Sequence, residues 1–240
     1  MKNYFIKKYY QINESAQTLD HVSKKVFWDK TYIKLSHAAQ YYVYQLAHDM
    51  AVRNNIREIL DIGCGVGTLL KKFFSPEEGF KIFGVDQPSA VDYCRQTIKN
   101  GVFISDLIES PAYELKSYLS AAPLIISADV IEHLLDPDKL LDYIKEFSDQ
   151  NTLIIISTPE RDAARGKGSL RPDNPHHVRE WNYQEFHQYI SESGFRILKH
   201  EIILSNKLNF DFATFRWIAW KIIVGLPIKH TQVVLCKKLT

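Results

Sequence analysis

The chain has 240 residues, of which 45% are hydrophobic and 24% are charged. This composition provides enough apolar side chains for a complete core, and it excludes a chain that is disordered throughout. The formal net charge at pH 7 is only +2, so the overall charge indicates neither a nucleic-acid partner nor a membrane surface. The length suits one large domain, with or without a small appendage.

Three widely spaced cysteines, Cys64, Cys94 and Cys236, form neither a CxxC pair nor a Cys/His cluster. Their spacing predicts neither a zinc site nor a disulfide framework, and reduced thiols favour a cytoplasmic location. Residues 1–8 lack the apolar run and the cleavage site of a signal peptide. No segment has the length of an uncharged membrane span, so we expect no stable membrane insertion.

Residues 1–55 are predicted to form an N-terminal helical cap, and residues 56–240 the main domain of a single structural unit. Ser36 is placed to cap a helix in the first of these regions. The apolar positions that recur there at helical spacing are Ala39, Tyr42, Val43, Leu46, Ala47 and Met50. The spacing therefore predicts that a helix precedes the first strand.

From residue 56 onward, short β-rich segments alternate with segments of helical periodicity. The β-rich segments are 57–62, 81–86, 102–105, 123–128 and 151–157. The clearest helix begins at Asp136-Pro137, where Asp can cap the helix and Pro suits its first position. Strands that alternate with helices predict an α/β fold with a parallel sheet, covered by helices on both faces.

The second half of the chain departs from strict alternation. Asn182 and Glu185 have the spacing of a capping box at the start of a helix. Two strands follow at about 195–204 and 231–237, and an apolar insert, residues 208–228, lies between them. The charges of the insert form no single polar face, so the sequence leaves a lid, an oligomer contact and core packing all open.

A glycine-rich turn, Gly63-Cys64-Gly65-Val66-Gly67, directly follows the first buried strand. Glycines at the carboxyl end of a parallel strand let the backbone approach a ligand closely. The next two strands end in Asp86 and Asp106. A carboxylate at the first position can accept both hydroxyl protons of a ribose, and one at the second suits an adenine amino group. Together these features predict an adenosine-bearing cofactor, although the turn alone also fits a NAD-binding domain.

These residues resemble motif I (Asp61 to Gly67), motif II (Asp86) and motif III (Asp106) of class I S-adenosylmethionine-dependent methyltransferases. The resemblance implies S-adenosyl-L-methionine as the cofactor and a Rossmann-like seven-stranded sheet in the order 3-2-1-4-5-7-6, with strand 7 antiparallel. The predicted N-terminal helices and a helical insert between strands 6 and 7 complete the expected fold. The cofactor-binding residues are then Asp61, Gly63, Cys64, Gly65, Gly67, Asp86, Gln87, Asp106, Leu107 and Asp129.

Two further segments resemble particular groups within the class I methyltransferases. Residues 127–134 are similar to the segment after the fourth strand in the quinone-biosynthesis O-methyltransferase-like group. Residues 171–181 are similar to a stretch in bacterial methyltransferases that are associated with surface-polysaccharide synthesis. The second resemblance implies a sugar or a glycan-linked acceptor.

A hydroxyl that attacks a sulfonium methyl group benefits from a general base, whereas a neutral amine needs less help. The candidate catalytic residues near the carboxyl ends of strands 4 and 5 are Asp129, His133, His176 and His177. We prefer His176 or His177, which lie in the polysaccharide-associated segment. The alternative is that these two histidines only hold their loop in place.

The connection formed by residues 158–181 is unusually long for a strand-to-helix loop. It starts where open α/β sheets bind their substrates, so it is predicted to be a substrate loop. Its Arg161, Arg165 and Arg179 could bind a phosphate or carboxylate of the substrate. A solvated charged face is the competing interpretation.

Potential metal ligands also gather after the fourth strand, where Asp129, Glu132, His133, Asp136 and Asp138 fall within ten residues. Asp136 is better placed as a helix cap, however, and the carboxylates of Asp129 and Glu132 need not converge. We therefore expect no bound metal ion.

The leading prediction is an S-adenosylmethionine-dependent methyltransferase that methylates an oxygen of a sugar or glycan-linked small molecule in bacterial surface (capsular) polysaccharide biosynthesis. A quinone, a phenol or an amine is the alternative acceptor, and a non-catalytic cofactor-binding scaffold is the alternative class. The sequence has no Asn-Pro-Pro-Tyr segment and no basic run with stacking aromatics, so we expect no nucleic-acid partner. The identity of the acceptor and the oligomeric state, monomer or homodimer, stay open.

Overall fold

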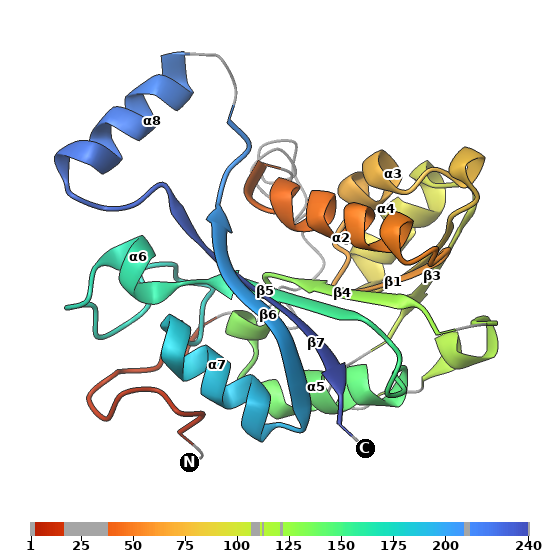
Figure 1. Ribbon diagram of the computed structural model, residues 1–240, viewed down its shortest axis with the longest axis horizontal. Coiled ribbons are helices and arrows are strands. Elements are labelled where there is room, and N and C mark those ends of the chain that lie inside the picture. Colours follow the sequence, from red (N-terminus) through yellow and green to blue (C-terminus); the bar gives the residue numbers. More distant parts are fainter. Residues whose placement is uncertain are drawn as a thin grey trace.

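The computed structural model describes residues 3–16, 38–106, 111, 113–120, 122–208 and 212–239. A central sheet lies between two layers of helices, and one further helix projects from the body (Figure 1). The strands are β1 (Glu58–Ile62), β2 (Lys81–Asp86), β3 (Gly101–Ser105), β4 (Leu124–Ala128), β5 (Ile154–Pro159), β6 (Phe195–Leu204) and β7 (Lys229–Lys238). The helices are α2 (Tyr41–Arg53), α3 (Thr68–Phe73), α4 (Pro88–Thr97), α5 (Pro137–Glu146), α6 (Arg161–Arg165), α7 (Tyr183–Glu192) and α8 (Phe212–Ile223). Short 3-10 helices cover Pro76–Glu78, Glu114–Ser117 and Ile131–His133.

The seven strands have the order β3-β2-β1-β4-β5-β7-β6, which confirms the predicted order. Strands β1 to β5 pair in parallel, and β7 pairs antiparallel with both β5 and β6. The carboxyl ends of the parallel strands therefore meet at one edge of the sheet, where open α/β sheets bind their ligands.

Alternate residues of the strands supply two hydrophobic cores, one on each face of the sheet. In β1, Leu60 and Ile62 belong to the core that contains residues of α5 and α7. The intervening Ile59 belongs to the core that contains residues of α2, α3 and α4. Because both faces are covered, the central strands β1 and β4 are buried along their whole length, and most of their residues are apolar.

The starts of two helices follow the sequence signals closely. In the predicted capping box, Asn182 Oδ1 accepts from the Glu185 amide at 3.0 Å, and Glu185 Oε2 accepts from the Asn182 amide at 3.0 Å. Pro137 opens α5 after Asp136, as predicted, but the Asp136 side chain makes no capping hydrogen bond. Its Oδ1 instead accepts from the Tyr4 hydroxyl at 3.1 Å, so a long-range partner replaces the expected cap.

The helical prediction for residues 1–55 is wrong for its first part, because residues 3–16 form turns and extended chain. This segment hydrogen-bonds along the 158–181 connection: the Asn13 amide donates to the Val178 carbonyl at 2.8 Å. Those backbone bonds take the place of the bonds a helix would make internally. Ser36, the predicted cap, lies outside the described residues.

Helix α2 is present, but its buried face differs from the predicted stripe. The buried positions are Val43, Tyr44, Ala47 and Ala51, whereas Tyr42 is only partly buried. The apolar pattern does not identify Tyr44 as buried, because a tyrosine hydroxyl needs a hydrogen-bond partner when it is buried. Here that partner comes from β1. The buried face of α2 is thus rotated relative to the predicted apolar stripe, so that Tyr44 replaces Tyr42 on it.

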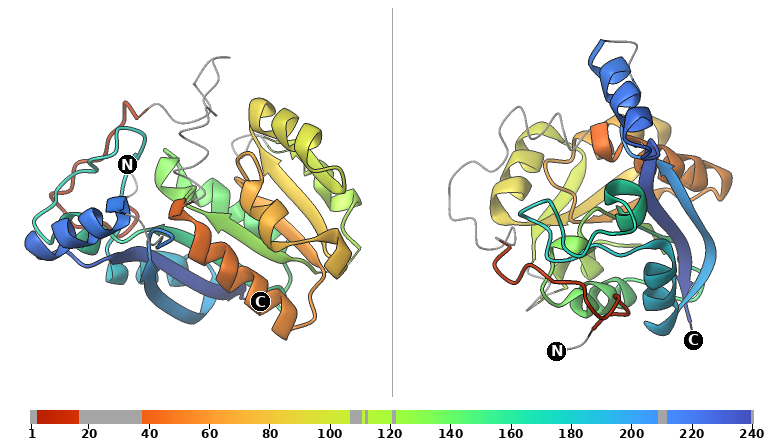
Figure 2. Two further views of the ribbon diagram at one scale, coloured as in Figure 1. Left: turned by 90° about the horizontal axis from the view of Figure 1, so that it is seen from above. Right: turned by 90° about the vertical axis from the view of Figure 1, so that its left-hand side faces the viewer.

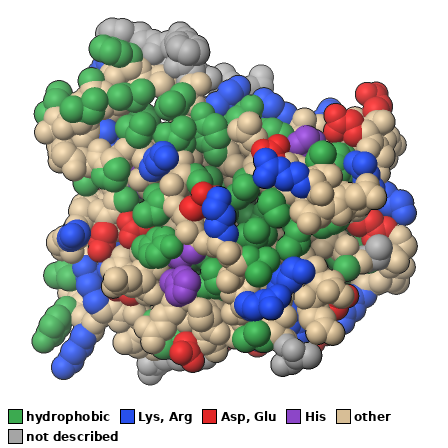
Figure 3. Space-filling view, viewed as in Figure 1, with side chains coloured by type: hydrophobic (Ala, Val, Ile, Leu, Met, Phe, Trp, Pro, Cys, Tyr) green, Lys and Arg blue, Asp and Glu red, His purple; other side chains and the backbone are tan. Residues whose placement is uncertain are grey.

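The apolar insert forms α8 between β6 and β7, as predicted, and this helix projects away from the sheet (Figures 1 and 2). Its exposed apolar side chains are Phe215, Trp220, Ile222 and Ile223. Figure 3 shows hydrophobic side chains gathered on this part of the surface. Within the described residues, no helix combines the length and the hydropathy that a membrane crossing requires.

We expect Gly63→Ala to destabilise the fold more than Gly79→Ala, a matched control at another left-handed glycine. The φ angles are similar, +85° and +82°, but an added Cβ at Gly63 would lie 2.3 Å from Val130 Cγ2, whereas none of the described atoms lies within 4 Å at Gly79. Both variants bear the left-handed backbone cost of roughly 1–2 kcal/mol. Overpacking should add about 1–3 kcal/mol at Gly63 alone.

Urea unfolding of both variants measures this difference. The double variant Gly63→Ala, Val130→Ala should recover part of the loss, because it removes the colliding methyl group. Equal free energies of unfolding for Gly63→Ala and Gly79→Ala would show that Val130 does not constrain the turn.

Candidate functional site

The glycine-rich turn links β1 to α3, and all three of its glycines adopt positive φ angles: 85° at Gly63, 54° at Gly65 and 65° at Gly67. Two of them are also required by packing. Val130 approaches Gly63, and Ile98 lies 2.7 Å from the position that a Cβ of Gly67 would occupy. The glycine pattern therefore reflects close protein packing around the turn as much as the approach of a ligand.

Asp86 connects the turn to the end of β2. Its Oδ2 accepts from the Gly65 amide at 2.6 Å, and its Oδ1 accepts from the Gln87 amide at 2.7 Å. The carboxylate therefore lies at the carboxyl end of β2, directly beside the glycine-rich turn. The geometry at Asp86 is thus compatible with the predicted ribose contact.

Asp61 is completely buried near the end of β1. Its Oδ2 accepts from the Tyr44 hydroxyl of α2 at 2.5 Å, and its Oδ1 has no hydrogen-bond partner among the described residues. Burial raises the pKa of Asp61 to about 7. A buried carboxylate oxygen without a donor is costly, so this oxygen fits a ligand that brings its own donor, such as an ammonium group.

Tyr44 is a site residue that the sequence analysis missed. It comes from α2, a helix that precedes the motif residues, and burial raises its pKa well above the usual value for a tyrosine. Its hydroxyl is therefore a donor to Asp61 at any ordinary pH. A tyrosine at helical spacing from Val43 and Ala47 carries no signal for this role without knowledge of which strand the helix covers.

Asp106, directly after β3, is buried and already holds two partners. Its Oδ2 accepts from the Tyr143 hydroxyl of α5 at 2.7 Å and from the Tyr113 amide at 3.1 Å. These bonds join α5 to the connection that follows β3. The predicted adenine contact of Asp106 stays a prediction, and Leu107 lies outside the described residues.

Asp129 follows β4 with a φ angle of 54°, a conformation that is uncommon for residues other than glycine. Its Oδ1 accepts from the Ser157 hydroxyl of β5 at 2.8 Å. Burial raises the pKa of Asp129 to about 6. The next residue is Val130, whose side chain packs against Gly63, so the end of β4 lies directly beside the glycine turn.

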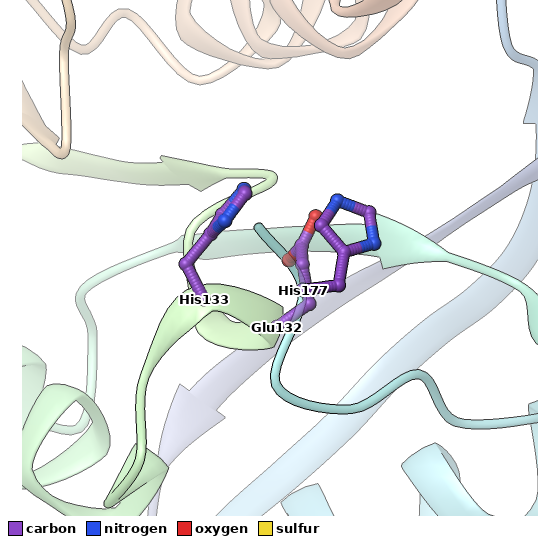
Figure 4. Close-up of side chains that lie close together, drawn as sticks. All are labelled: Glu132, His133 and His177. Carbon is purple, nitrogen blue, oxygen red and sulfur yellow. The ribbon is translucent and has the colours of Figure 1, made fainter. Parts of the chain in front are cut away.

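Glu132, His133 and His177 come together beyond Asp129 (Figure 4). Glu132 and His133 belong to the 3-10 helix after β4, and His177 belongs to the 158–181 connection. The Val178 amide donates to the Glu132 carbonyl at 2.8 Å, which holds the connection against the 3-10 helix. The two imidazole rings meet edge to face, with centroids 4.8 Å apart.

The hydrogen bonds of the two histidines in this cluster involve the Nδ1 atom of each ring. His133 Nδ1 lies 2.8 Å from the His176 carbonyl, which can only accept, so Nδ1 carries the proton. Burial lowers the pKa of His133 to about 3. His177 Nδ1 lies 2.6 Å from Glu180 Oε1. Of the predicted bases, His133 and His177 therefore share one cluster, and His176 contributes its backbone carbonyl to it.

Two of the three arginines that were predicted to bind substrate, Arg161 and Arg179, are engaged in contacts within the protein. Arg161 is fully buried, and its guanidinium makes two hydrogen bonds to Glu185, at 2.7 and 3.0 Å. Arg179 is also buried and donates to the carbonyls of Leu134 and Leu135 at 3.0 and 2.7 Å. Both anchor the connection to the body of the protein. Charge alone could not separate this role from ligand binding.

Arg165 differs from these two in keeping 27% of its side chain exposed. Its Nη2 lies 3.2 Å from Glu180 Oε1, and its Nε lies 3.6 Å from Asp173 Oδ2. Arg165 is thus partly buried, and both of its carboxylate partners belong to the same connection. Its predicted contact with the acceptor stays a prediction.

Solved structures of methyltransferases have folds similar to that of this chain. An S-adenosylmethionine-dependent methyltransferase from Clostridium acetobutylicum has a TM-score of 0.57 and 16% identity, with coverage of 88% of this chain and 100% of that chain. Human N-acetylserotonin methyltransferase, solved in complex with S-adenosylmethionine, has a TM-score of 0.57 and 20% identity, with coverage of 88% and 55%. At such low identities the likeness shows the fold alone.

Sequence comparison adds two curated relatives from two strains of Mycobacterium tuberculosis, both described as a probable S-adenosylmethionine-dependent methyltransferase. Each is 25% identical over 156 residues, which are 61% of this chain and 51% of the relative. The match thus spans about half the length of these relatives. Residues 35–200 also match the family described as a methyltransferase domain. This match includes the glycine turn and the histidine cluster, and the chain belongs to the methyltransferase domain family.

Proposed function

We propose that this chain is an S-adenosylmethionine-dependent methyltransferase that methylates a hydroxyl oxygen of a small molecule. The observation that carries the proposal is the contact between Val130 and Gly63. It places the glycine turn, which suits the cofactor, directly beside the segment that carries Asp129 and the histidine cluster. A donor site and an acceptor site that adjoin in this way are what an in-line transfer requires.

The cofactor half of the proposal is supported by two carboxylates beside the glycine-rich turn. Asp61 Oδ1 is buried without a partner among the described residues, and it suits the ammonium group of the methionine portion. Asp86 ends β2 and accepts from the Gly65 amide of the turn, a position that suits the ribose hydroxyls. S-adenosylmethionine supplies an electrophilic methyl group when it is bound.

The acceptor half is supported by the lone pairs that the cluster presents. We place the acceptor hydroxyl beside the Nε2 atoms of His133 and His177, and the hydroxyl proton passes to His177 Nε2 as the oxygen attacks. A carbon–oxygen bond to the methyl group then forms, the carbon–sulfur bond breaks, and its electron pair stays on sulfur. Burial of both rings limits the number of water molecules that would otherwise compete as methyl acceptors.

The acceptor class in this proposal is a sugar or glycan-linked group of bacterial surface-polysaccharide synthesis. Its support is the resemblance of residues 171–181, together with the position of His177 from that segment in the acceptor cluster. A quinone or other lipid-like phenol is the second candidate, and the exposed apolar side chains of α8 favour it. A cytoplasmic location suits either acceptor, and all three cysteines are free and buried.

We expect the affinity for S-adenosylmethionine to fall as the pH decreases from 8 to 6. Asp61, with a pKa of about 7, is ionised above that pH and attracts an ammonium group, but it is protonated below it. One linked proton weakens binding by up to about tenfold per pH unit. Isothermal titration at a series of pH values measures the slope. Asp61→Asn should bind more weakly with a flatter pH profile, and a wild-type affinity that stays constant over this range contradicts the assignment.

We expect His177→Ala to lower kcat by about a hundredfold to ten-thousandfold, the usual worth of a group that assists proton removal. His176→Ala is the control, because it preserves the backbone carbonyl that accepts from His133 Nδ1. Turnover can be followed as S-adenosylhomocysteine release with sugar nucleotides, oligosaccharides and phenols as acceptors. Both variants should retain cofactor affinity. Full activity of His177→Ala, or equal losses in both variants, would refute the assignment.

The same acceptor panel tests the other class of function, a cofactor-binding scaffold. A scaffold would bind S-adenosylmethionine and S-adenosylhomocysteine in titrations but would release no product with any acceptor. Turnover with a sugar-containing acceptor supports the leading proposal, and turnover restricted to phenols supports the second candidate. Failure to bind either S-adenosylmethionine or S-adenosylhomocysteine would contradict both the methyltransferase proposal and the scaffold alternative.

A further inference from the structure

Glu132, His133 and His177 have the geometry of a small metal-binding cluster. Each offers one ligand atom, these atoms lie within 4.8 Å of one another, and all three residues are buried. Figure 4 shows the Glu132 carboxylate between the two imidazole rings, with the three side chains pointing toward one another. Two different segments supply them, the 3-10 helix after β4 and the 158–181 connection, so the convergence belongs to the fold and not to local spacing.

The protons of both imidazoles are placed as they are in metal-binding histidines. The His176 carbonyl accepts from His133 Nδ1, and the Glu180 carboxylate accepts from His177 Nδ1. Each ring therefore holds its proton on Nδ1 and keeps a lone pair on Nε2. A carbonyl or carboxylate that fixes the outer ring nitrogen is the usual support of a histidine ligand. Glu180 is held in turn by Arg165.

The contact of His177 Nε2 confirms the direction of its lone pair. Asn174 Nδ2 lies 2.9 Å from this nitrogen. The Asn174 oxygen accepts from the His176 amide at 3.0 Å, which identifies the atom that faces the ring as the donor nitrogen. An electropositive N–H group thus lies where Nε2 would bind a cation, and this amide would have to turn aside when a cation binds.

Glu132 provides an independent indication that the cluster lacks a ligand. The residue is completely buried, and its Oε2 accepts from the Thr158 hydroxyl at 2.9 Å. Its Oε1 is buried too and has no hydrogen-bond partner among the described residues. A carboxylate oxygen in this situation is stabilised by a cation or a strong donor. No lysine or arginine of the described chain forms an ion pair with it.

We infer that Glu132, His133 and His177 bind a divalent transition-metal ion, with zinc, manganese, iron and cobalt as the suitable class. Two imidazoles and one carboxylate favour these ions over magnesium and calcium, which prefer oxygen ligands throughout. Three protein ligands leave coordination positions open for an acceptor oxygen, as in metal sites that act as Lewis acids. The inference replaces the expectation from sequence that no metal is bound.

The inference deepens the proposed function and rests on it for the identity of the metal's further ligand, the acceptor hydroxyl. A bound cation lowers the pKa of that hydroxyl, and the proton passes to water. The oxygen then forms its bond to the methyl group as the carbon–sulfur bond breaks. In this arrangement the two histidines activate the acceptor hydroxyl through the cation, which lies between their Nε2 atoms and the hydroxyl oxygen.

Metal titration of the purified full chain tests the site without an activity assay. The protein is first freed of metal with a chelator and then titrated with Zn²⁺, Co²⁺ or Mg²⁺, and the visible absorption of Co²⁺ reports histidine ligation. We expect one equivalent of Zn²⁺ or Co²⁺ to bind and Mg²⁺ to bind much more weakly. Glu132→Gln and His177→Ala should each weaken Co²⁺ binding by at least about tenfold.

The control is His48→Ala, which removes a histidine of α2 that lies outside the cluster. It should retain wild-type Co²⁺ affinity, and all variants should retain S-adenosylmethionine affinity and cooperative thermal unfolding, which shows that they are folded. Glu132→Gln and His177→Ala change separate segments, so misfolding of one leaves the other as the test. Absent Zn²⁺ and Co²⁺ binding, or binding that both variants preserve, would overturn the inference.

The outcome for the metal can be separated from the outcome for the proposed function. Methyl transfer that continues at the full rate in excess chelator removes the metal inference and leaves the methyltransferase intact. Stoichiometric metal binding without turnover of any acceptor leaves the site and removes the proposed reaction. Turnover that chelation abolishes and Zn²⁺, Mn²⁺ or Co²⁺ restores supports both.

Discussion

The close packing of Val130 against Gly63 is the constraint on which the functional half of the structure depends. It brings the end of β4 to the turn after β1 with no space for even one methyl group between them. Everything on either side is arranged around this contact: Asp61 and Asp86 on the side of the turn, and Asp129 and the histidine cluster on the other. The packing of neighbouring parallel strands thus fixes the distance between the glycine-rich turn and the segment after β4.

Buried polar groups mark the parts of the site that the protein alone does not satisfy. Glu180 and Glu185 are buried too, but each meets an arginine or a histidine, so they stabilise the connection. Asp61 and Glu132 each keep one oxygen without a partner among the described residues. An unsatisfied buried oxygen lowers the stability of a fold. Two such oxygens near the contact between Val130 and Gly63 are therefore better explained by ligand binding than by a purely structural role. Function and stability compete at these two residues.

Much of the fold and the cofactor side could be predicted from the sequence, because both depend on local signals. Alternating hydrophobic segments identified the strands, and Gly63-Cys64-Gly65-Val66-Gly67 identified the turn at the end of β1. The acceptor side could not be predicted as well, because it is assembled from residues distant in the sequence. His133 and His177 meet only through tertiary structure, and Arg161 reads as a surface charge until Glu185 is placed beside it. Tyr44 shows the same limit, since its role depends on which strand α2 covers.

The N-terminal segment 3–16 has a consequence for the order in which the two halves of the site are completed. The Tyr10 hydroxyl accepts from the Glu180 amide, and the Asn13 amide donates to the Val178 carbonyl, across about 170 residues of intervening chain. Contacts between such distant residues form late in folding, because a long loop must close first. During synthesis the start of the chain must therefore wait for residues 170–181 to emerge. The glycine-rich turn, built from residues closer in sequence, can form earlier, so the proposed donor side of the site takes shape before the proposed acceptor side.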